Sequence, residues 1–314
     1  MSILNPTKKP PLKSLITGAG GQSAYWLAKD LTFYGRQVIR CSSQGLGLKL
    51  PYGDAAAFRD ILTEIQPNEI YHLACPSQLI NSLEFEKEVS LMSVDVVLVM
   101  LRWIESVSPQ TRFFFASSSE VFGTPTHSPQ IETTAPNPEH PYAVAKLAGQ
   151  KLLKYFRDFK HLYAVTGILY NHESHLRSSE FVSRKIARAV AEIYLGKNSI
   201  LELGNLNAVR DWSHASDFAT GFRLSLEAPE PDDYIFASGV ARTVKDFCRI
   251  AFSSVGMDWA MHVTENPAFF RPDCVPPRVG NPEKAKQILG WNSVRTFDDW
   301  VGEMVRIEIT QRSE

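Results

Sequence analysis

The chain has 314 residues, enough for one large domain or for a domain with a smaller lobe. Its hydrophobic fraction of 44% and charged fraction of 21% are typical of a soluble globular protein. The formal net charge of -1 provides no overall field that would attract nucleic acid, and no apolar run is long enough to span a bilayer. We therefore expect neither nucleic acid nor a membrane as a partner.

The N-terminus and the cysteines indicate the compartment. Residues 1–13 hold lysines and prolines but lack the apolar core of a secretory signal. The four cysteines are scattered, without a Cys-x-x-Cys pair, at Cys41, Cys75, Cys248 and Cys274. This spacing predicts reduced thiols in a cytoplasmic protein and no metal site.

A glycine motif follows the first predicted strand, residues 12–17. It has the form Gly18-x-x-Gly21-x-x-Ala24 and opens a helical pattern that runs to Gly35. Between a strand and a helix, such glycines let backbone N–H groups approach a pyrophosphate at the positive end of the helix dipole. The motif predicts a dinucleotide site, with Ala24 in place of a third glycine.

The second predicted strand, residues 37–40, ends at Arg40 rather than at an acidic residue. An acid there would bind the ribose 2′-hydroxyl of NAD, whereas an arginine accommodates the 2′-phosphate of NADP. We therefore predict NADP, with NAD as the alternative. Residues 48–54 predict a third strand. Asp54 is placed to contact the adenine and equally to cap the helix predicted over residues 55–65, and the two roles are compatible.

Strands and helices continue to alternate along the first half of the chain. Further strands are predicted at residues 69–74, 112–115 and 161–169, and a long helix at 90–107. This alternation indicates an α/β fold with a doubly wound parallel (Rossmann) sheet. We predict a dinucleotide-binding domain at 12–170. Residues 171–310 are predicted to form mainly a smaller, more irregular substrate-binding lobe, with segments that return to the first domain.

Polar residues follow the fifth strand in a pattern that suggests catalysis. Ser118 and Glu120 leave its end, and Pro141 begins a helix in which Tyr142 and Lys146 lie one turn apart. An ammonium group at this spacing should lower the pKa of the phenol and let it act as a base. A Tyr-x-x-x-Lys pair alone also fits an exposed helix face, but the strand and the glycine motif favour the catalytic interpretation.

This combination resembles the extended short-chain dehydrogenase/reductase family. Within it, most of the chain is similar to the GDP-mannose 4,6-dehydratases. The segments that carry this similarity are Asn171-His172-Glu173-Ser174, Phe181-Val182-Ser183-Arg184-Lys185, Leu203-Gly204-Asn205-Leu206, Arg210-Asp211-Trp212, Phe270-Arg271-Pro272, Gly280-Asn281-Pro282-Glu283-Lys284-Ala285-Lys286 and Leu289-Gly290-Trp291.

The resemblance implies a lyase that converts GDP-mannose, or a related GDP-hexose or GDP-heptose, to the GDP-4-keto-6-deoxy sugar. The implied catalytic residues are Ser118, Glu120, Tyr142 and Lys146. The implied cofactor-binding residues are Gly18, Gly21, Gln22, Ser23, Arg40, Asp54, Leu73, Ala74, Tyr142 and Lys146. The implied substrate-binding residues are Ser77, Asn171, Lys185, Asn205, Arg210 and Arg271.

Three departures from the family leave alternatives open. Ser118 stands where the family usually has threonine, and His175-Leu176-Arg177-Ser178 replaces a Pro-Arg-Arg-Gly run, which bears on sugar specificity. The segment between Arg40 and Asp54 is short, so we expect a homodimer rather than a tetramer. The alternatives are another nucleotide-sugar enzyme (4-epimerase, 4-keto reductase or UDP-uronic acid decarboxylase) or an inactive dinucleotide sensor.

Overall fold

The computed structural model describes residues 10–42, 46–76, 82–270 and 276–313, and its centre is a seven-stranded parallel sheet. The strand order is β10-β6-β5-β4-β1-β2-β3. The strands are β1 (Lys13–Thr17), β2 (Gln37–Ser42), β3 (Leu48–Lys49), β4 (Glu69–His72), β5 (Arg112–Ala116), β6 (Ala164–Leu169) and β10 (Asp233–Phe236). The predicted doubly wound parallel sheet is confirmed.

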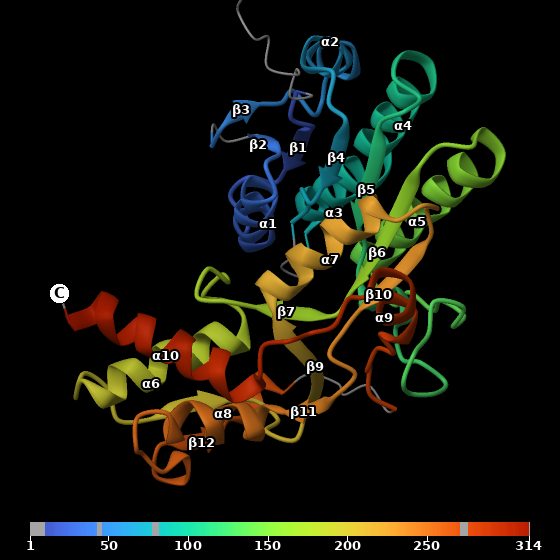
Figure 1. Cartoon of the computed structure of the whole chain (residues 1–314). Helices are drawn as coiled ribbons and strands as arrows, with labels where there is room; N and C mark the ends of the chain where they lie inside the picture. Colours follow the sequence, from blue (N-terminus) through green and yellow to red (C-terminus); the bar gives the residue numbers. More distant parts are fainter. Residues whose placement is uncertain (1–9, 43–45, 77–81, 271–275, 314) are drawn as a thin grey trace, which may run out of the picture.

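Helices cover both faces of this sheet, as Figure 1 shows. One face packs against α2 (Ala55–Ile65), α4 (Val96–Val107) and α5 (Pro141–Lys160), and the other against α1 (Gln22–Phe33), α7 (Ala215–Glu227) and α9 (Glu283–Leu289). Consecutive strand residues point to opposite faces, so both must be apolar. Leu15, Ile70 and Phe113 pack on the first face, and their neighbours Ile16, Tyr71 and Phe114 on the second.

The remaining elements form a second hydrophobic core around α6 (Val182–Tyr194), α8 (Val244–Ser253) and α10 (Phe297–Ser313). Two small sheets accompany them. One has the order β11-β9-β7, formed by Ala241–Thr243, Val209–His214 and Asn171–Glu173, and the other pairs β12 (Val263–Glu265) with β8 (Leu201–Leu203). Figure 1 shows these helices grouped below the sheet. The smaller C-terminal lobe is confirmed, although it is more helical than expected.

Segments of the second half, α7, α9 and β10, return to the large sheet. Helix α7 packs on α1, and β10 pairs in parallel with β6, from Asp233 opposite Thr166 to Phe236 opposite Leu169. The predicted boundary at residue 170 itself stays a prediction. In the described ranges, no helix is long and apolar enough to cross a membrane.

Three element boundaries differ from those predicted. Strand β3 ends at Lys49 because Pro51 cannot donate to a ladder and Asp54 already caps α2. The predicted helix 90–107 begins earlier, as α3 (Leu83–Ser90), and passes through a π-helical turn, η1 (Leu91–Asp95), into α4. Strand β6 starts at Ala164, since His161 adopts a left-handed conformation that ends α5.

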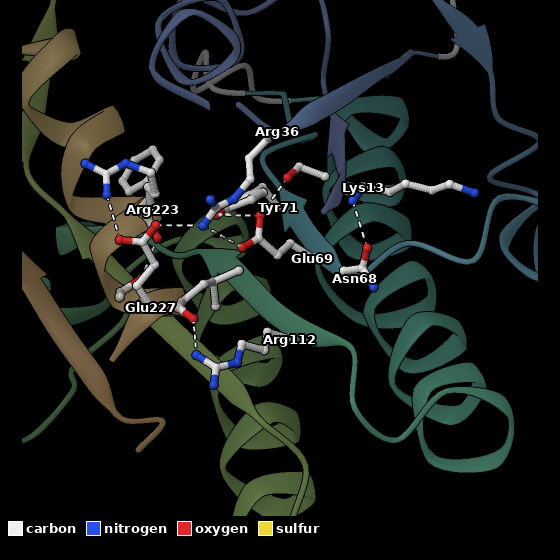
Figure 2. Close-up of polar contacts among 12 residues, drawn as sticks. Lys13, Arg36, Asn68, Glu69, Tyr71, Arg112, Arg223 and Glu227 are labelled. Atoms are coloured by element: carbon white, nitrogen blue, oxygen red, sulfur yellow. Dashed lines mark hydrogen bonds and ion pairs between the residues drawn. The ribbon is translucent and has the colours of Figure 1, made fainter. Parts of the chain in front are cut away.

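A charged network lies at the amino-terminal ends of the central strands, as Figure 2 shows. The Glu69 carboxylate is only 3% exposed and accepts a 2.6 Å hydrogen bond from Ser14 Oγ. Arg36 Nη2 lies 3.5 Å from Glu69 and 2.7 Å from Glu227 on α7. These contacts join β1 and β4 to α7, at the end of the sheet opposite the residues predicted to be catalytic.

Candidate active site

The predicted catalytic side chains follow the carboxyl ends of the central strands, where parallel sheets bind their ligands. Ser118 is extended and caps the short helix η2 (Ser119–Phe122), since its Oγ accepts the Glu120 N–H at 3.2 Å. Pro141 occupies the first position of α5, which fixes the start of the helix that carries Tyr142. The Ser118 cap and the Pro141 ring thus set where η2 and α5 begin.

Lys146 is buried, with 3% of its surface exposed, beneath Tyr142. Its Nζ donates to the Ala116 carbonyl oxygen at 2.9 Å and lies 5.7 Å from the centre of the Tyr142 ring. The side chain therefore spans from α5 to the end of β5, as the one-turn spacing requires.

The expected lowering of the Tyr142 pKa is not found in the protein alone. Burial raises the pKa of this phenol above its usual range, and the neighbouring Cys75 and the negative charge of Glu120 add to the rise. A hydrogen bond with Ser118 and the charge of Arg177 act in the opposite direction but are outweighed. The charge of a neighbouring ammonium group by itself predicts a lower pKa, but the desolvation of the buried phenol outweighs it.

Glu120 is a half-buried carboxylate with two strong donors. Its Oε2 accepts from His140 Nε2 at 3.0 Å and from Arg278 Nη1 at 2.7 Å. Burial would raise its pKa, but His140 and Arg278 together outweigh burial and hold the pKa of Glu120 below its usual value. The group is therefore ionised at neutral pH, as a base must be.

The glycine turn forms an open cradle at the start of α1. Gly18 has a φ of +76°, and a Cβ there would lie 2.9 Å from the backbone nitrogen of Ala74. Gly20 and Gly21 are exposed, and no side chain caps α1, whose N-cap is Gly21. Uncapped N–H groups at a helix N-terminus carry a partial positive charge, so this cradle fits a dinucleotide pyrophosphate.

The side chains predicted to bind the cofactor beside this turn are already engaged. Gln22 Nε2 donates to the carbonyl of His172 at 2.7 Å, and Ser23 Oγ lies 2.8 Å from His172 Nε2. The backbone N–H groups of Leu73 and Ala74 both donate to the hydroxyl of Thr17. Gln22 and Ser23 therefore tie α1 to β7, and their backbone N–H groups remain as the predicted cofactor contacts.

Arg40 and Asp54 lie near the predicted adenosine end of the site. Arg40 Nη2 donates to the Ala19 carbonyl, which folds the guanidinium group over the glycine turn. Asp54 Oδ1 accepts from the N–H groups of Ala56 and Ala57 at 3.1 and 3.0 Å. Of the two roles considered for Asp54, the helix cap is confirmed, and the adenine contact stays a prediction.

The predicted substrate residues fall into two groups on neighbouring elements. Asn171 opens β7 and Arg210 lies in the adjoining strand β9, where its Nη1 donates to the Val209 carbonyl at 2.7 Å. Lys185, on α6, donates to the Glu202 carbonyl at 2.8 Å, and Asn205 Oδ1 accepts from the Asn207 N–H just after β8. Ser77 and Arg271 lie outside the described residues.

Sequence reasoning missed His140 and Arg278, the two partners of Glu120. His140 had a local signal, since it occupies the N-cap position directly before Pro141. Arg278 had none, because it lies 158 positions along the chain from Glu120. Among the residues that the structure describes, no cluster of histidine, cysteine and carboxylate side chains could hold a metal ion.

A parallel sheet with a glycine turn after its first strand, and a Tyr-x-x-x-Lys helix beside its fifth, defines an extended short-chain dehydrogenase/reductase. The structure of RMD from Pseudomonas aeruginosa, solved with NADPH, has the same fold, with a TM-score of 0.82 at 18% identity over 95% of this chain and 99% of that one.

Comparison of sequences narrows the class. The family model for GDP-mannose 4,6 dehydratase matches residues 48–304. GDP-mannose 4,6 dehydratase 1 of Arabidopsis thaliana is 37% identical over 98% of this chain and 92% of its own. The Homo sapiens GDP-mannose 4,6 dehydratase is 35% identical over 96% and 92%. The chain belongs to the GDP-mannose 4,6-dehydratase family, which confirms the predicted family and its enzyme class, the lyases.

Proposed function

We propose that this protein removes water from GDP-mannose, or from a related GDP-hexose or GDP-heptose, to give the GDP-4-keto-6-deoxy sugar. The observation that carries the proposal is the grouping of Ser118, Glu120 and Tyr142 after the carboxyl end of β5 and at the start of α5. A phenol and a hydroxyl suffice to oxidise a sugar alcohol reversibly. The additional ionised carboxylate, Glu120, supplies the base that elimination of water requires.

In the proposed cycle, Tyr142 accepts the proton of the sugar O4 hydroxyl while Ser118 hydrogen-bonds the same oxygen. Lys146 stabilises the phenolate that begins this step. A bound nicotinamide would supply an acceptor for the C4 hydride and a donor of hydride to C6, and its oxidised ring would add a positive charge that favours the phenolate.

Glu120 then performs the step that distinguishes a dehydratase. Oxidation at C4 makes the C5 proton acidic, and the ionised carboxylate removes it. The same proton leaves with the C6 hydroxyl as water, so Glu120 is ionised again. Return of the hydride to C6 would be accompanied by protonation of C5. The proton that Tyr142 took from O4 balances this one, directly or through solvent, so Tyr142, Glu120 and the cofactor all end unchanged.

We propose NADP as the cofactor, with the pyrophosphate on the glycine turn and the 2′-phosphate near Arg40. The support is the position of the Arg40 guanidinium over the turn and the lack of an acidic residue at the end of β2. Thermal unfolding with NADP and with NAD tests this assignment, because a ligand stabilises the fold in proportion to its affinity. Arg40→Gln should lose most of the NADP shift and little of the NAD shift.

In the decisive experiment, the purified protein is incubated with GDP-mannose and NADP, and the mass of the product is measured. Loss of water supports the dehydratase. In a parallel incubation with a UDP-uronic acid, loss of carbon dioxide would indicate a decarboxylase, and a new product of unchanged mass, seen by NMR, would indicate an epimerase. A new 6-methyl signal in the NMR spectrum identifies the site of deoxygenation. No turnover with any GDP-hexose or GDP-heptose would refute the proposal.

Tyr142→Phe provides the mechanistic test, with Tyr155→Phe as its control on the same helix. The first variant should abolish turnover and keep NADP binding, since it removes only the proton acceptor. Tyr155 is exposed on α5 and should tolerate the change. If wild type and Tyr142→Phe both bind NADP without turnover, a dinucleotide-sensing role gains support.

We also propose a cytoplasmic homodimer. Three cysteines, Cys41, Cys75 and Cys248, are free thiols in the structure, which supports a reducing compartment. The long helix α5 exposes Val144, Tyr155 and Phe159 to solvent, and an exposed apolar face of this kind supports association. Sedimentation velocity over a range of concentrations measures the oligomeric state.

A further inference from the structure

The Glu120 carboxylate is held by side chains from two distant parts of the chain. His140 Nε2 lies 3.0 Å and Arg278 Nη1 2.7 Å from the same oxygen, Oε2. Among the described residues, both donors found for this carboxylate therefore bond to one of its two oxygens. This arrangement leaves Oε1 as the oxygen that can meet a proton from outside.

The tautomer of His140 is fixed by the start of α5. Its Nδ1 accepts the Ala143 backbone N–H at 3.3 Å, and a backbone N–H can only donate. The ring proton therefore resides on Nε2 and points at Glu120. The helix cap and the contact with the carboxylate are thus one arrangement.

Arg278 is delivered by an anchored segment. The N–H of Gln130 donates to the carbonyl of Val279, and the N–H of Asn281 donates to the carbonyl of Gln130, both at 2.8 Å. The buried Asp211 accepts the N–H of Gly280 at 3.1 Å. These bonds fix the backbone directly after Arg278, which indicates a positioned cation rather than a mobile surface side chain.

We propose that Arg278 and His140 are positioning residues that hold the Glu120 carboxylate by Oε2 and leave Oε1 to accept the substrate proton. This rests on the proposed function, in which Glu120 is the base. The clamp, as we call Arg278 and His140 together, keeps the buried carboxylate ionised and limits its rotation. An enzyme gains rate when such a group is oriented before the reaction.

The charges around Glu120 determine what loss of the clamp does. Among the described residues, His140 and Arg278 act on the pKa of Glu120. The charge of Glu120 in turn raises the pKa of Tyr142, on which Cys75 and Arg177 also act. Without Arg278, burial is no longer balanced and the pKa of Glu120 rises. An opposite charge at this distance commonly accounts for a pKa difference of about 1 to 3.

The test compares pH–rate profiles of wild type, Arg278→Met and Arg278→Lys with GDP-mannose as substrate. In Arg278→Met, the acid limb of kcat should move up by about 1 to 3 pH units. Arg278→Lys should show a smaller shift, because lysine keeps the positive charge but lacks the planar guanidinium group. His140→Asn keeps a capping side chain and should give a smaller shift in the same direction.

Arg157→Met is the matched control. Arg157 pairs with Asp233 at 2.8 Å and its side chain is 12% exposed, against 2.7 Å and 18% for Arg278. Its loss should cost comparable stability without moving the acid limb. Unshifted limbs in the Arg278→Met and Arg157→Met variants alike would overturn the clamp, whatever their stabilities.

A second measurement does not depend on turnover. The ¹³C signal of the Glu120 carboxyl group, assigned by its absence in Glu120→Gln, can be titrated in wild type and in Arg278→Met. The midpoint should be higher in the variant, and equal midpoints would overturn the clamp. If wild type releases water from no GDP-hexose or GDP-heptose, the proposed function fails, while the titration still decides the clamp.

Discussion

Replacing Gly18 by alanine tests whether the glycine turn is required by the fold as well as by the cofactor. The residue has a φ of +76°, and holding alanine in that region costs about 1–2 kcal/mol. The new methyl group would also lie 2.9 Å from the Ala74 nitrogen, and overpacking of this kind costs about 1–3 kcal/mol. The Ala74 N–H is bonded to Thr17, so this backbone cannot shift freely. We expect a loss of about 2–5 kcal/mol in the free energy of unfolding.

Gly35→Ala separates the two contributions. Gly35 has nearly the same φ, +74°, but no atom within 4 Å of the added Cβ. The free energy of unfolding of Gly35→Ala should fall by the backbone strain alone, about 1–2 kcal/mol. Urea denaturation measures both variants, and thermal unfolding with NADP should show a ligand shift only in Gly35→Ala. If both variants lose the same stability, the close approach of the turn to the end of β4 does not constrain residue 18.

Three further changes probe the scaffold around the site. Asp54→Ala should cost about 0.5–2 kcal/mol in urea denaturation by uncapping α2, and Asp54→Asn much less; equal losses would argue against the cap. Glu69→Ala should cost about 3 kcal/mol, the lower end for a broken buried pair because Arg36 keeps Glu227, and a loss under about 1 kcal/mol would show that the network is dispensable. Burial lowers the pKa of His72 from 6.5 to about 4, so only the unfolded chain binds its proton between these values. Stability should therefore fall by about 3 kcal/mol as the pH drops from 6.5 to 4, and His72→Gln should flatten that slope in pH-dependent urea denaturation.

Local patterns in the sequence were sufficient for the large sheet. Apolar runs on both faces predicted buried parallel strands, and the starts of α2 and α5 were visible as the N-cap residue Asp54 and the first helical residue Pro141. The spacing of Tyr142 and Lys146 placed them on one helix face because helix geometry repeats every 3.6 residues. Motifs shared with the GDP-mannose 4,6-dehydratases along most of the chain were sufficient to predict the family.

Segments with short or interrupted periodicity were predicted less well. The strand expected over residues 48–54 shrank to two residues, and the helix expected from Ser90 begins at Leu83 and contains a π-turn. The second half contains three-residue strands, such as β8 and β11, that are too short for a recognisable alternation. These elements form because of what they pack against.

The sequence by itself determined the fold class, the glycine turn and the family, and it predicted the catalytic residues, since each depends on neighbours within a few turns of chain or on a shared motif. Only the tertiary structure decided that Arg278 meets Glu120, that Gln22 and Ser23 bind β7, and that burial raises the pKa of Tyr142. Contacts across more than a hundred residues and the desolvation of a charge depend on how the whole chain packs. No local pattern carries that information.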